Sequence, residues 1–469
     1  MAKIALIGRD NLEMPDSGVA VLSDPREARL VDWVAAELGA KTVSIERQAR
    51  WRPCSFIVAE RDGTILRIYV RARREQEDLT FFPLSHEAEI LRTFKRTGIP
   101  APEVYGICPD PEAIVMEWVP GRPDLGTVED PTERQEILLD FITWLARVHD
   151  LDIGEFRDAG LPPAVGQAVT FGLFDRFETL YRNAKKRPEP EVEFVIGWLR
   201  RNPPAPLSRS HFITADSGQF LFDKGRVTSL LDLELGHFGD PAFDLASLLM
   251  RDLSESLGDL NAAFRHYAAM SGAPIDPRRV DYYTALWGIM TPMSISALAR
   301  DPTPELDLRM YLEFLYVLSR IPLEAIARLT GTALEPVPPL PDCQPSSAVA
   351  AALAAATGAL DHLPPTTAIQ GYRHGCAVEM AHYLALLATT EPAILEAEKG
   401  EVAALLGRVI EDETERDTAL EQFVLKADPS MDAELVRFFR RRVARRQALL
   451  GTEYKIFKRQ EMQAIDWPT

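Results

Sequence analysis

Apolar residues recur at two different spacings in the first quarter of this 469-residue chain. The segment "PREARLVDWVAAEL" has a helical period, opens with Asp24, Pro25 and Glu27, and closes at Gly39. Beyond it, "TVSIERQ", "SFIVAE" and "TILRIYVR" have strand composition, and the two-residue sequence Asp62-Gly63 predicts a hairpin turn. "HEAEILRTFKRT" predicts a further helix, capped by Ser85, and "AIVMEWV" a further strand. The pattern predicts a small mixed α/β lobe over residues 1–120, with an N-terminal strand/helix extension.

Helical periods dominate after the hinge-like residues Pro120 to Pro123. They are interrupted by one hairpin, "QFLFDKGRVTSLLDLE", and we assign residues 121–334 to a helical lobe that carries it. The proline-rich segment 335–345 cannot form a helix or a central strand and is predicted to be a linker. Residues 346–469 are rich in Ala and Leu with a helical pattern, which predicts a separate all-helical accessory domain. The expected fold class is therefore α+β.

Charge and composition exclude several classes of protein. The formal net charge of −18 disfavours a nucleic-acid-binding surface. The sequence shows no secretory leader and no apolar run long enough to span a membrane, so we expect a cytoplasmic protein without a membrane partner. Its four cysteines lie far apart without a CxxC pair, which argues against a disulfide framework or a zinc knuckle.

The hairpin carries the first candidate chemistry. With its turn at Lys224-Gly225, Gln219 should face Leu230, and alternation should put Gln219 and Asp232 on one face. Diagonal neighbours lie about 7 to 8 Å apart, a span that an amide oxygen and a carboxylate can close around Mg²⁺. Asp216, just upstream, is placed to accept a proton from a hydroxyl. The alternative is that these acidic residues are solvated turn residues or helix caps.

A cation and a carboxylate in the first lobe support the chemical interpretation. Glu87 shares a helix face with apolar residues and so needs a partner. Arg67 and Arg71 lie on one face of the preceding strand and are the candidate partners. A strand cation bridged to a helix glutamate is the arrangement with which kinases steady nucleotide phosphates. A surface ion pair of little energetic weight is the other interpretation.

The order of these segments resembles the aminoglycoside phosphotransferase and choline kinase superfamily. The resemblance rests on "ILRIYVR", "HEAEILRTFKRTGIPAPEVYG", "AIVMEWVPGRPD", "LARVHDLD", "DSGQFLFDKGRVTSLLDLELGHFGDPAFDLA" and the helical stretch to about Arg328. It is most similar to bacterial phosphotransferase family proteins that have a Trp-Arg-Pro segment, here Trp51-Arg52-Pro53, in place of a glycine-containing phosphate loop. The tail, with "YRHGCAVEMAHYLALLA" and "AEKGEVAALLG", is similar to a helical domain of unknown role fused to such proteins.

This resemblance implies a bilobal protein-kinase-like fold and an ATP- and Mg²⁺-dependent transfer of phosphate to a small-molecule hydroxyl, with GTP left open as the nucleotide. It implies that Asp216 is the catalytic base and that Asp232 and Gln219 hold the metal ion. Structural roles fall to Asp240 and Asp244. The nucleotide would contact the clamp of Arg67 or Arg71 with Glu87, and the adenine hinge of Met116, Glu117 and Val119.

Three departures from the family pattern bear on activity. The usual His-Gly-Asp reads Thr214-Ala215-Asp216, and a gap-free alignment from Gln219 would put Thr214 in the place of the base. We prefer the shortened loop, which keeps the acid. The nucleotide lysine is replaced by arginine, a planar fork and not a point charge, and no glycine-rich loop occurs in residues 41–60. A pseudokinase that binds nucleotide or acts as a scaffold is therefore the second hypothesis, and another nucleotide-dependent transferase the third.

Two further features have structural interpretations. His149 is expected to end a helix and pack rather than react. The arginines in "RFFRRRVARR", residues 437–446, are expected to form a solvated helix face rather than a grip for an anionic ligand. The accessory domain would offer a surface for self-association or for a protein partner.

Overall fold

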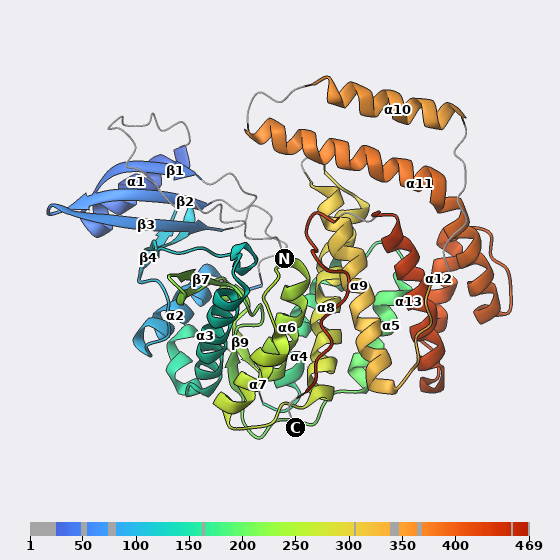
Figure 1. Cartoon of the computed structure of the whole chain (residues 1–469), viewed down its shortest axis with the longest axis horizontal. Coiled ribbons are helices and arrows are strands. Elements are labelled where there is room, and N and C mark those ends of the chain that lie inside the picture. Colours follow the sequence, from blue (N-terminus) through green and yellow to red (C-terminus); the bar gives the residue numbers. More distant parts are fainter. Residues whose placement is uncertain are drawn as a thin grey trace. The chain divides into compact units, whose positions relative to one another are not determined.

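The structure is a computed structural model that describes residues 25–47, 54–73, 81–161, 165–303, 306–337, 347–363, 368–451 and 454–467. The chain forms two compact units, each discontinuous in sequence. We call Ala2–Leu173, Pro206–Ile275 and Gln463–Thr469 the strand-bearing unit, and Phe174–Ala205 with Asp276–Met462 the helical unit. All the strands in the described residues belong to the first of these (Figure 1).

An antiparallel five-stranded sheet begins the strand-bearing unit, with the order β1-β2-β3-β5-β4. Its members are β1 (Lys41–Arg47), β2 (Cys54–Arg61), β3 (Thr64–Ala72), β4 (Val104–Pro109) and β5 (Glu112–Glu117). The predicted hairpin turn is confirmed: Asp62 and Gly63 both have positive φ, at 51° and 75°, and Arg61 pairs with Thr64. The predicted first helix is also confirmed as α1 (Pro25–Leu38), which packs Leu30 and Val34 into the apolar core of this sheet.

Helix α2 (Leu84–Arg96) follows the sheet's third strand and buries its apolar residues together with Glu87. Its first residue is Leu84, with Pro83 in the capping position, so the predicted cap at Ser85 is wrong by two residues. The helix ends just before Gly98, whose φ of 78° is left-handed. As a result, Ile90, Leu91 and Phe94 fix the helix in the core and hold Glu87 on the same buried face.

The remainder of the strand-bearing unit combines helices with two small antiparallel pairs. Its helices are α3 (Pro131–Asp150), α6 (Pro241–Ser254) and α7 (Leu260–Ser271). Strand β6 (His211–Ile213) pairs with β9 (His237–Gly239), and β7 (Phe220–Asp223) pairs with β8 (Arg226–Leu230). The second pair is the predicted hairpin, and its turn residues Lys224 and Gly225 have φ of 47° and 76°. The α+β fold class is thus confirmed.

The helical unit contains α5 (Pro190–Arg201), α8 (Pro277–Arg300), α9 (Leu308–Thr330), α10 (Ser347–Asp361), α11 (Ala368–Leu406), α12 (Glu413–Val424) and α13 (Asp432–Ala448). Helix α4 (Ala168–Ala184) contributes its residues from Phe174 onward. Helices α8 and α9 approach closely at Gly288, where a Cβ would lie 2.9 Å from a ring carbon of Pro322. Glycine is therefore required at this contact because a larger residue would separate the two helices.

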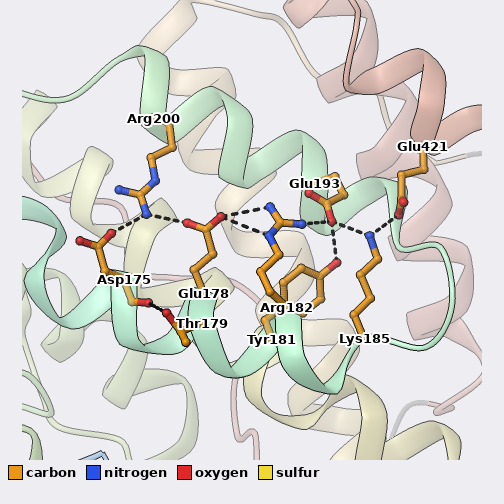
Figure 2. Close-up of polar contacts among 9 residues, drawn as sticks. All are labelled: Asp175, Glu178, Thr179, Tyr181, Arg182, Lys185, Glu193, Arg200 and Glu421. Atoms are coloured by element: carbon orange, nitrogen blue, oxygen red, sulfur yellow. Dashed lines mark hydrogen bonds and ion pairs between the residues drawn. The ribbon is translucent and has the colours of Figure 1, made fainter.

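An ion-pair network joins α4, α5 and α12 in the helical unit (Figure 2). Along it, each cation lies between two carboxylates: Arg200 between Asp175 and Glu178, Arg182 between Glu178 and Glu193, and Lys185 between Glu193 and Glu421. Lys185 Nζ lies 2.5 Å from Glu193 Oε1 and 2.6 Å from Glu421 Oε2. The network explains why charged residues occur on helix faces that pack together.

The arginine run of α13 does not form the expected solvated face. The Arg442 side chain is 1% exposed, and it pairs with Glu398 of α11, Asp417 of α12 and Glu191 of α5. Arg446 also contacts Glu398, at 3.0 Å. Burial alone would raise the pKa of Glu398, but Arg442 and Arg446 lower it overall. These arginines therefore bind the protein's own carboxylates, and the expectation of a solvated face was wrong because it ignored partners on other helices.

The compact units are not laid out along the predicted domain limits at residues 120, 334 and 345. Helices on both sides of the proline-rich segment, α9 and α13, pack together in the helical unit. The last residues, from Gln463, belong to the strand-bearing unit. Residues 338–345 of the predicted linker lie outside the described residues, so the linker and the limits stay predictions. In the described part of the chain, no helix is both long and apolar enough to cross a membrane.

Candidate functional site

The hairpin brings Gln219 and Asp232 close together, but not in the predicted register. Phe220 pairs with Leu230, and the N–H of Leu231 donates to the carbonyl of Gln219 at 3.0 Å. A register irregularity between Leu221 and Phe222 causes this one-residue slip. The predicted pairing of Gln219 with Leu230 is therefore wrong. The direction of the Asp232 side chain is set instead by a left-handed φ of 55° just after β8.

Asp216 lies between Gln219 and an arginine. Gln219 Nε2 donates to Asp216 Oδ2 at 2.5 Å, and Arg251 of α6 donates to Asp216 Oδ1 at 2.5 Å. Burial raises the pKa of Asp216; Arg251 opposes this rise and the negative charge of Asp232 adds to it. Asp232 directly follows Leu231, whose N–H donates to the carbonyl of Gln219, so both aspartates lie beside Gln219. Asp216, Gln219 and Asp232 thus form one cluster.

Asp244 of α6 holds the loop that carries Asp216 through hydrogen bonds. The backbone N–H groups of Thr214 and Ala215 donate to the two oxygens of Asp244 at 2.8 Å, and the Thr214 hydroxyl donates to it as well. His149 Nε2 lies 3.0 Å from Asp244, and its Nδ1 lies 2.7 Å from the hydroxyl of Tyr267. His149 is therefore packed and hydrogen-bonded at the end of α3, in a supporting position.

Ala215 has a φ of 62°, in the left-handed region that favours glycine. This is the position at which the family's His-Gly-Asp motif has its glycine. The backbone of Ala215 is compatible with the predicted alignment of Thr214-Ala215-Asp216 with that motif, and the role of Asp216 as the base stays a prediction.

Arg71 connects the sheet, α2 and the hairpin. Its side chain is 6% exposed, and Nε lies 2.9 Å from Glu87 Oε2. Its Nη2 pairs with Asp232 and lies 3.4 Å from Glu234. Burial works against the charged form of Arg71, but Asp232, Glu87 and Glu234 raise its pKa well above the usual value. The guanidinium is therefore a fixed positive charge beside Asp232.

Arg67 is exposed and two alternation steps away on the same strand, so Arg71 and not Arg67 meets Glu87. The proposed hinge is the end of β5 with the two residues after it. Met116 is buried, and the Glu117 carboxylate pairs with Lys95 at 3.3 Å. The N–H of Glu117 already donates to the carbonyl of Glu103. Within the described residues, the N–H of Val119 has no intramolecular acceptor.

Sequence reasoning missed three members of the site: Arg251, Glu255 and Glu234. Arg251 and Glu255 could have been found from helical spacing. Asp244, Ser247 and Arg251 stand at i, i+3 and i+7, and all three contact the loop that contains Asp216. One face of α6 is therefore dedicated to this loop.

Two side chains of the site carry oxygen atoms of the kind that a hard divalent cation binds. With Nε2 of Gln219 bound to Asp216, the amide oxygen is the atom that remains for a metal ion, and Asp232 supplies a carboxylate. Arg71 also binds this carboxylate, so a metal ion would share or replace that contact. Among the described residues, no cluster of three or more His, Cys, Asp or Glu side chains is arranged to hold a metal.

Residues 53–283 match the model of a family described as "Phosphotransferase enzyme family". Over this segment the chain is similar to the phosphotransferase enzyme family. A candidate aminoglycoside phosphotransferase from Ralstonia eutropha JMP134 superposes with a TM-score of 0.50 and 18% identity, over 64% of this chain and 98% of that chain. The kinase-like fold of the phosphotransferase segment is thereby confirmed, and the sequence resemblance with it.

Two curated relatives are larger proteins. Acyl-CoA dehydrogenase family member 10 of Mus musculus is 28% identical over 204 residues, which are 37% of this chain and 17% of that protein. Probable acyl-CoA dehydrogenase IBR3 of Arabidopsis thaliana is 27% identical over 217 residues, 41% of this chain and 26% of that protein. The chain thus spans about a quarter or less of these relatives, whose names do not define its reaction.

The phosphotransferase match ends at residue 283, so most of the helical unit lies beyond it. The subgroup segment Trp51-Arg52-Pro53 lies outside the described residues. The roles predicted for the site residues stay predictions, which the geometry now makes specific.

Proposed function

We propose that this chain, which resembles the phosphotransferase enzyme family over residues 53–283, is an ATP-dependent small-molecule kinase that transfers the γ-phosphate to a hydroxyl group. The observation that carries the proposal is the convergence of Asp216, Gln219 and Asp232 beside the Arg71–Glu87 pair. Phosphoryl transfer needs little covalent chemistry from a protein; it needs a positioned base, a metal ion and fixed positive charge. This cluster offers groups suited to all three roles.

Asp216 is the proposed base. It would orient the acceptor hydroxyl and accept its proton, while Asp244 holds the backbone of its loop. Arg71, held by Glu87, would place its guanidinium against the nucleotide phosphates. In the proposed hinge, the donor to the adenine base is the N–H of Val119, which has no acceptor among the described residues. Met116 and Glu117 precede it in the chain, and Pro120 follows it.

Asp232 and the amide oxygen of Gln219 are the proposed ligands of Mg²⁺. When bound, the ion would neutralise charge on the phosphate oxygens and bring the triphosphate into line. The acceptor is proposed to be a small molecule with a hydroxyl group, and neither a nucleic acid nor a membrane. A cytoplasmic location, and a role for the C-terminal helices in self-association or partner binding, stay predictions.

A specific observation favours the second hypothesis, a pseudokinase. Arg71 pairs with Asp232, the carboxylate that a metal-dependent kinase needs, and both oxygens of Asp216 accept hydrogen bonds from the protein. A protein that only binds nucleotide, or acts as a scaffold, could keep these contacts permanently. The two functions differ in whether a divalent ion enters the site with the nucleotide.

The thermal midpoint in ATP with and without Mg²⁺ separates them. A ligand that binds the native state at a hundred times its dissociation constant stabilises it by about 2.7 kcal/mol. We expect a Mg²⁺-dependent rise that is lost in Asp232→Ala and kept in Asp223→Ala, an exposed acid of the same hairpin. A large loss of ATP hydrolysis in Asp216→Asn, with a measurable residual rate, would then identify the base. No shift at millimolar nucleotide would support the scaffold and refute the kinase.

A further inference from the structure

Arg251 reaches the candidate base from α6. Its side chain is 10% exposed, and its two terminal nitrogens contact two different carboxylates. Nη2 donates to Asp216 Oδ1 at 2.5 Å, and Nη1 lies 3.3 Å from Oε1 of Glu255, one helical turn further on. The guanidinium is therefore held at both ends, and the planar fork is preorganised before any ligand binds.

The stem of Arg251 also supports the loop. Gly218 packs directly on it: a Cβ at this position would lie 3.1 Å from Cγ of Arg251 and 3.2 Å from a methyl carbon of Leu248. The φ of Gly218 is 91°, which side-chain-bearing residues rarely adopt. The loop from Asp216 to Gln219 is thus seated on the arginine stem, while the arginine head holds the aspartate.

The two contacts on Asp216 define the orientation of its carboxylate. Arg251 holds Oδ1 and Gln219 holds Oδ2, each at 2.5 Å. Each carboxylate oxygen can accept a second hydrogen bond, so an acceptor hydroxyl can still approach. Arg251 and Gln219 fix the plane of the Asp216 carboxylate. They therefore determine the direction from which an acceptor hydroxyl can approach it.

We propose that Arg251 is a positioning residue, which acts through Asp216 by clamping its carboxylate in the plane needed to receive the acceptor hydroxyl. The inference rests on the proposed kinase function. It assigns to Arg251 no contact with nucleotide or acceptor. Glu255 is the second anchor, which keeps the guanidinium from turning away from Asp216.

The test measures acceptor-independent hydrolysis of Mg·ATP by the full chain. Because misplacing a reacting group by about 1 Å can cost about 100-fold in rate, we expect Arg251→Met to lower kcat by that order. KM for Mg·ATP should change less than about threefold, since Arg251 acts only on the base. Arg251→Lys should recover about tenfold of the loss, and Glu255→Gln should lie between wild type and Arg251→Met.

The decisive comparison is made in the Asp216→Asn background. A residue that acts only through Asp216 should have no further effect there, so the double variant should match Asp216→Asn within about twofold. Arg309→Met is the matched control, because Arg309 is 8% exposed, pairs with Glu313 at the same i,i+4 spacing and contacts none of the site residues in any described ion pair. It should lose stability but keep kcat.

Two results would overturn the inference. One is an equal loss from Arg251→Met in both backgrounds; the other is a rise in KM for Mg·ATP that accounts for the whole effect. If Arg251→Met does not fold, the same criteria apply to Arg251→Lys and Glu255→Gln. The failure of the kinase proposal itself is recognised separately, because wild type would then show neither a Mg·ATP-dependent thermal shift nor hydrolysis that depends on Asp216.

Discussion

At the scale of single residues, Arg71 shows why a lysine is not its equivalent. Its guanidinium meets Glu87 through Nε and meets Asp232 and Glu234 through Nη2. These contacts use different nitrogen atoms of one planar guanidinium group, whereas a lysine side chain has a single compact ammonium group. An arginine at this position therefore keeps the charge that a lysine would have and adds a link to the hairpin. This link makes the position of Arg71 depend on Asp232 as well as on Glu87.

Glu189 of the helical unit is a second residue whose charge matters, because its protonation makes the stability of the fold depend on pH. Burial raises its pKa to about 7, although Arg300 opposes the rise. Because the folded state holds this proton more tightly than the unfolded chain does, its contribution to stability is lost as the pH rises from about 4.5 to about 7. Above that range the charged, buried carboxylate costs about 3 kcal/mol.

We therefore expect Glu189→Gln to stabilise the protein at pH 8 relative to wild type, and to have a much smaller effect at pH 5. Urea unfolding at the two pH values measures the difference directly. Other buried carboxyls also titrate, so the comparison is between variant and wild type at each pH. A Glu189→Gln effect that is equal at pH 5 and pH 8 would show that Glu189 has an ordinary pKa.

At the scale of elements, the sequence predicted the parts of the site better than their mutual placement. The β7–β8 turn followed from Lys224-Gly225. The sequence offered Arg67 or Arg71 as the partner of Glu87, because a carboxylate on an apolar face needs a cation, and the structure shows that it is Arg71. The register of the hairpin was missed because no local signal announces the irregularity at Leu221. Arg251 was missed although it shares a helix face with Asp244, because the loop that both residues contact lies about 30 residues earlier in the sequence.

The same limit applies to α13, and it gives a test. A repeated arginine resembles a solvated face in sequence, yet Arg442 is buried against carboxylates from three other helices. Removing one partner of a buried ion pair costs about 3–5 kcal/mol. We expect that loss for Arg442→Met. For Arg437→Met, which gives up a bond to the carbonyl of Ala333, the loss should be about 1 kcal/mol. Denaturant unfolding measures the free energy of unfolding of both variants. A loss for Arg442→Met no larger than the loss for Arg437→Met would show that the buried ion pairs add no net stability.

At the scale of the whole molecule, the last described residues, 463–467, pack in the strand-bearing unit rather than in the helical unit that precedes them in the sequence. The separate helical domain expected after the proline-rich segment stays a prediction, and composition alone does not tell where the last described residues pack. Gln463 Nε2 donates to Asp252 Oδ2 at 2.9 Å and to the carbonyl of Gly258 at 2.7 Å, and Trp467 stacks on Phe264. Residues 463–467 therefore pack against the connection between α6 and α7 and the ends of these two helices. Glu255 is part of the same connection.

This placement predicts that changes at Gln463 weaken the α6–α7 connection. Gln463→Ala removes a donor from the buried Asp252 and should cost about 1–3 kcal/mol. Gln463→Glu should cost more, because its carboxylate would face that of Asp252 and the carbonyl of Gly258 and could donate to neither. Asp466→Ala is the control, since Asp466 is exposed and contacts Asn261 through its backbone N–H.

Hydrogen exchange at the amides of Leu257 and Leu260 reports on this connection directly, because Leu257 donates to Asp252 and Leu260 to Gln463. We expect protection at the Leu257 amide to be highest in Asp466→Ala, lower in Gln463→Ala and lowest in Gln463→Glu, and protection at the Leu260 amide to fall in Gln463→Ala, which removes its acceptor. Since Glu255 anchors Arg251, the same order as at Leu257 is expected for the rate of ATP hydrolysis. Protection in Gln463→Glu equal to that in Asp466→Ala would mean that the C-terminal segment only rests on the connection and does not hold it.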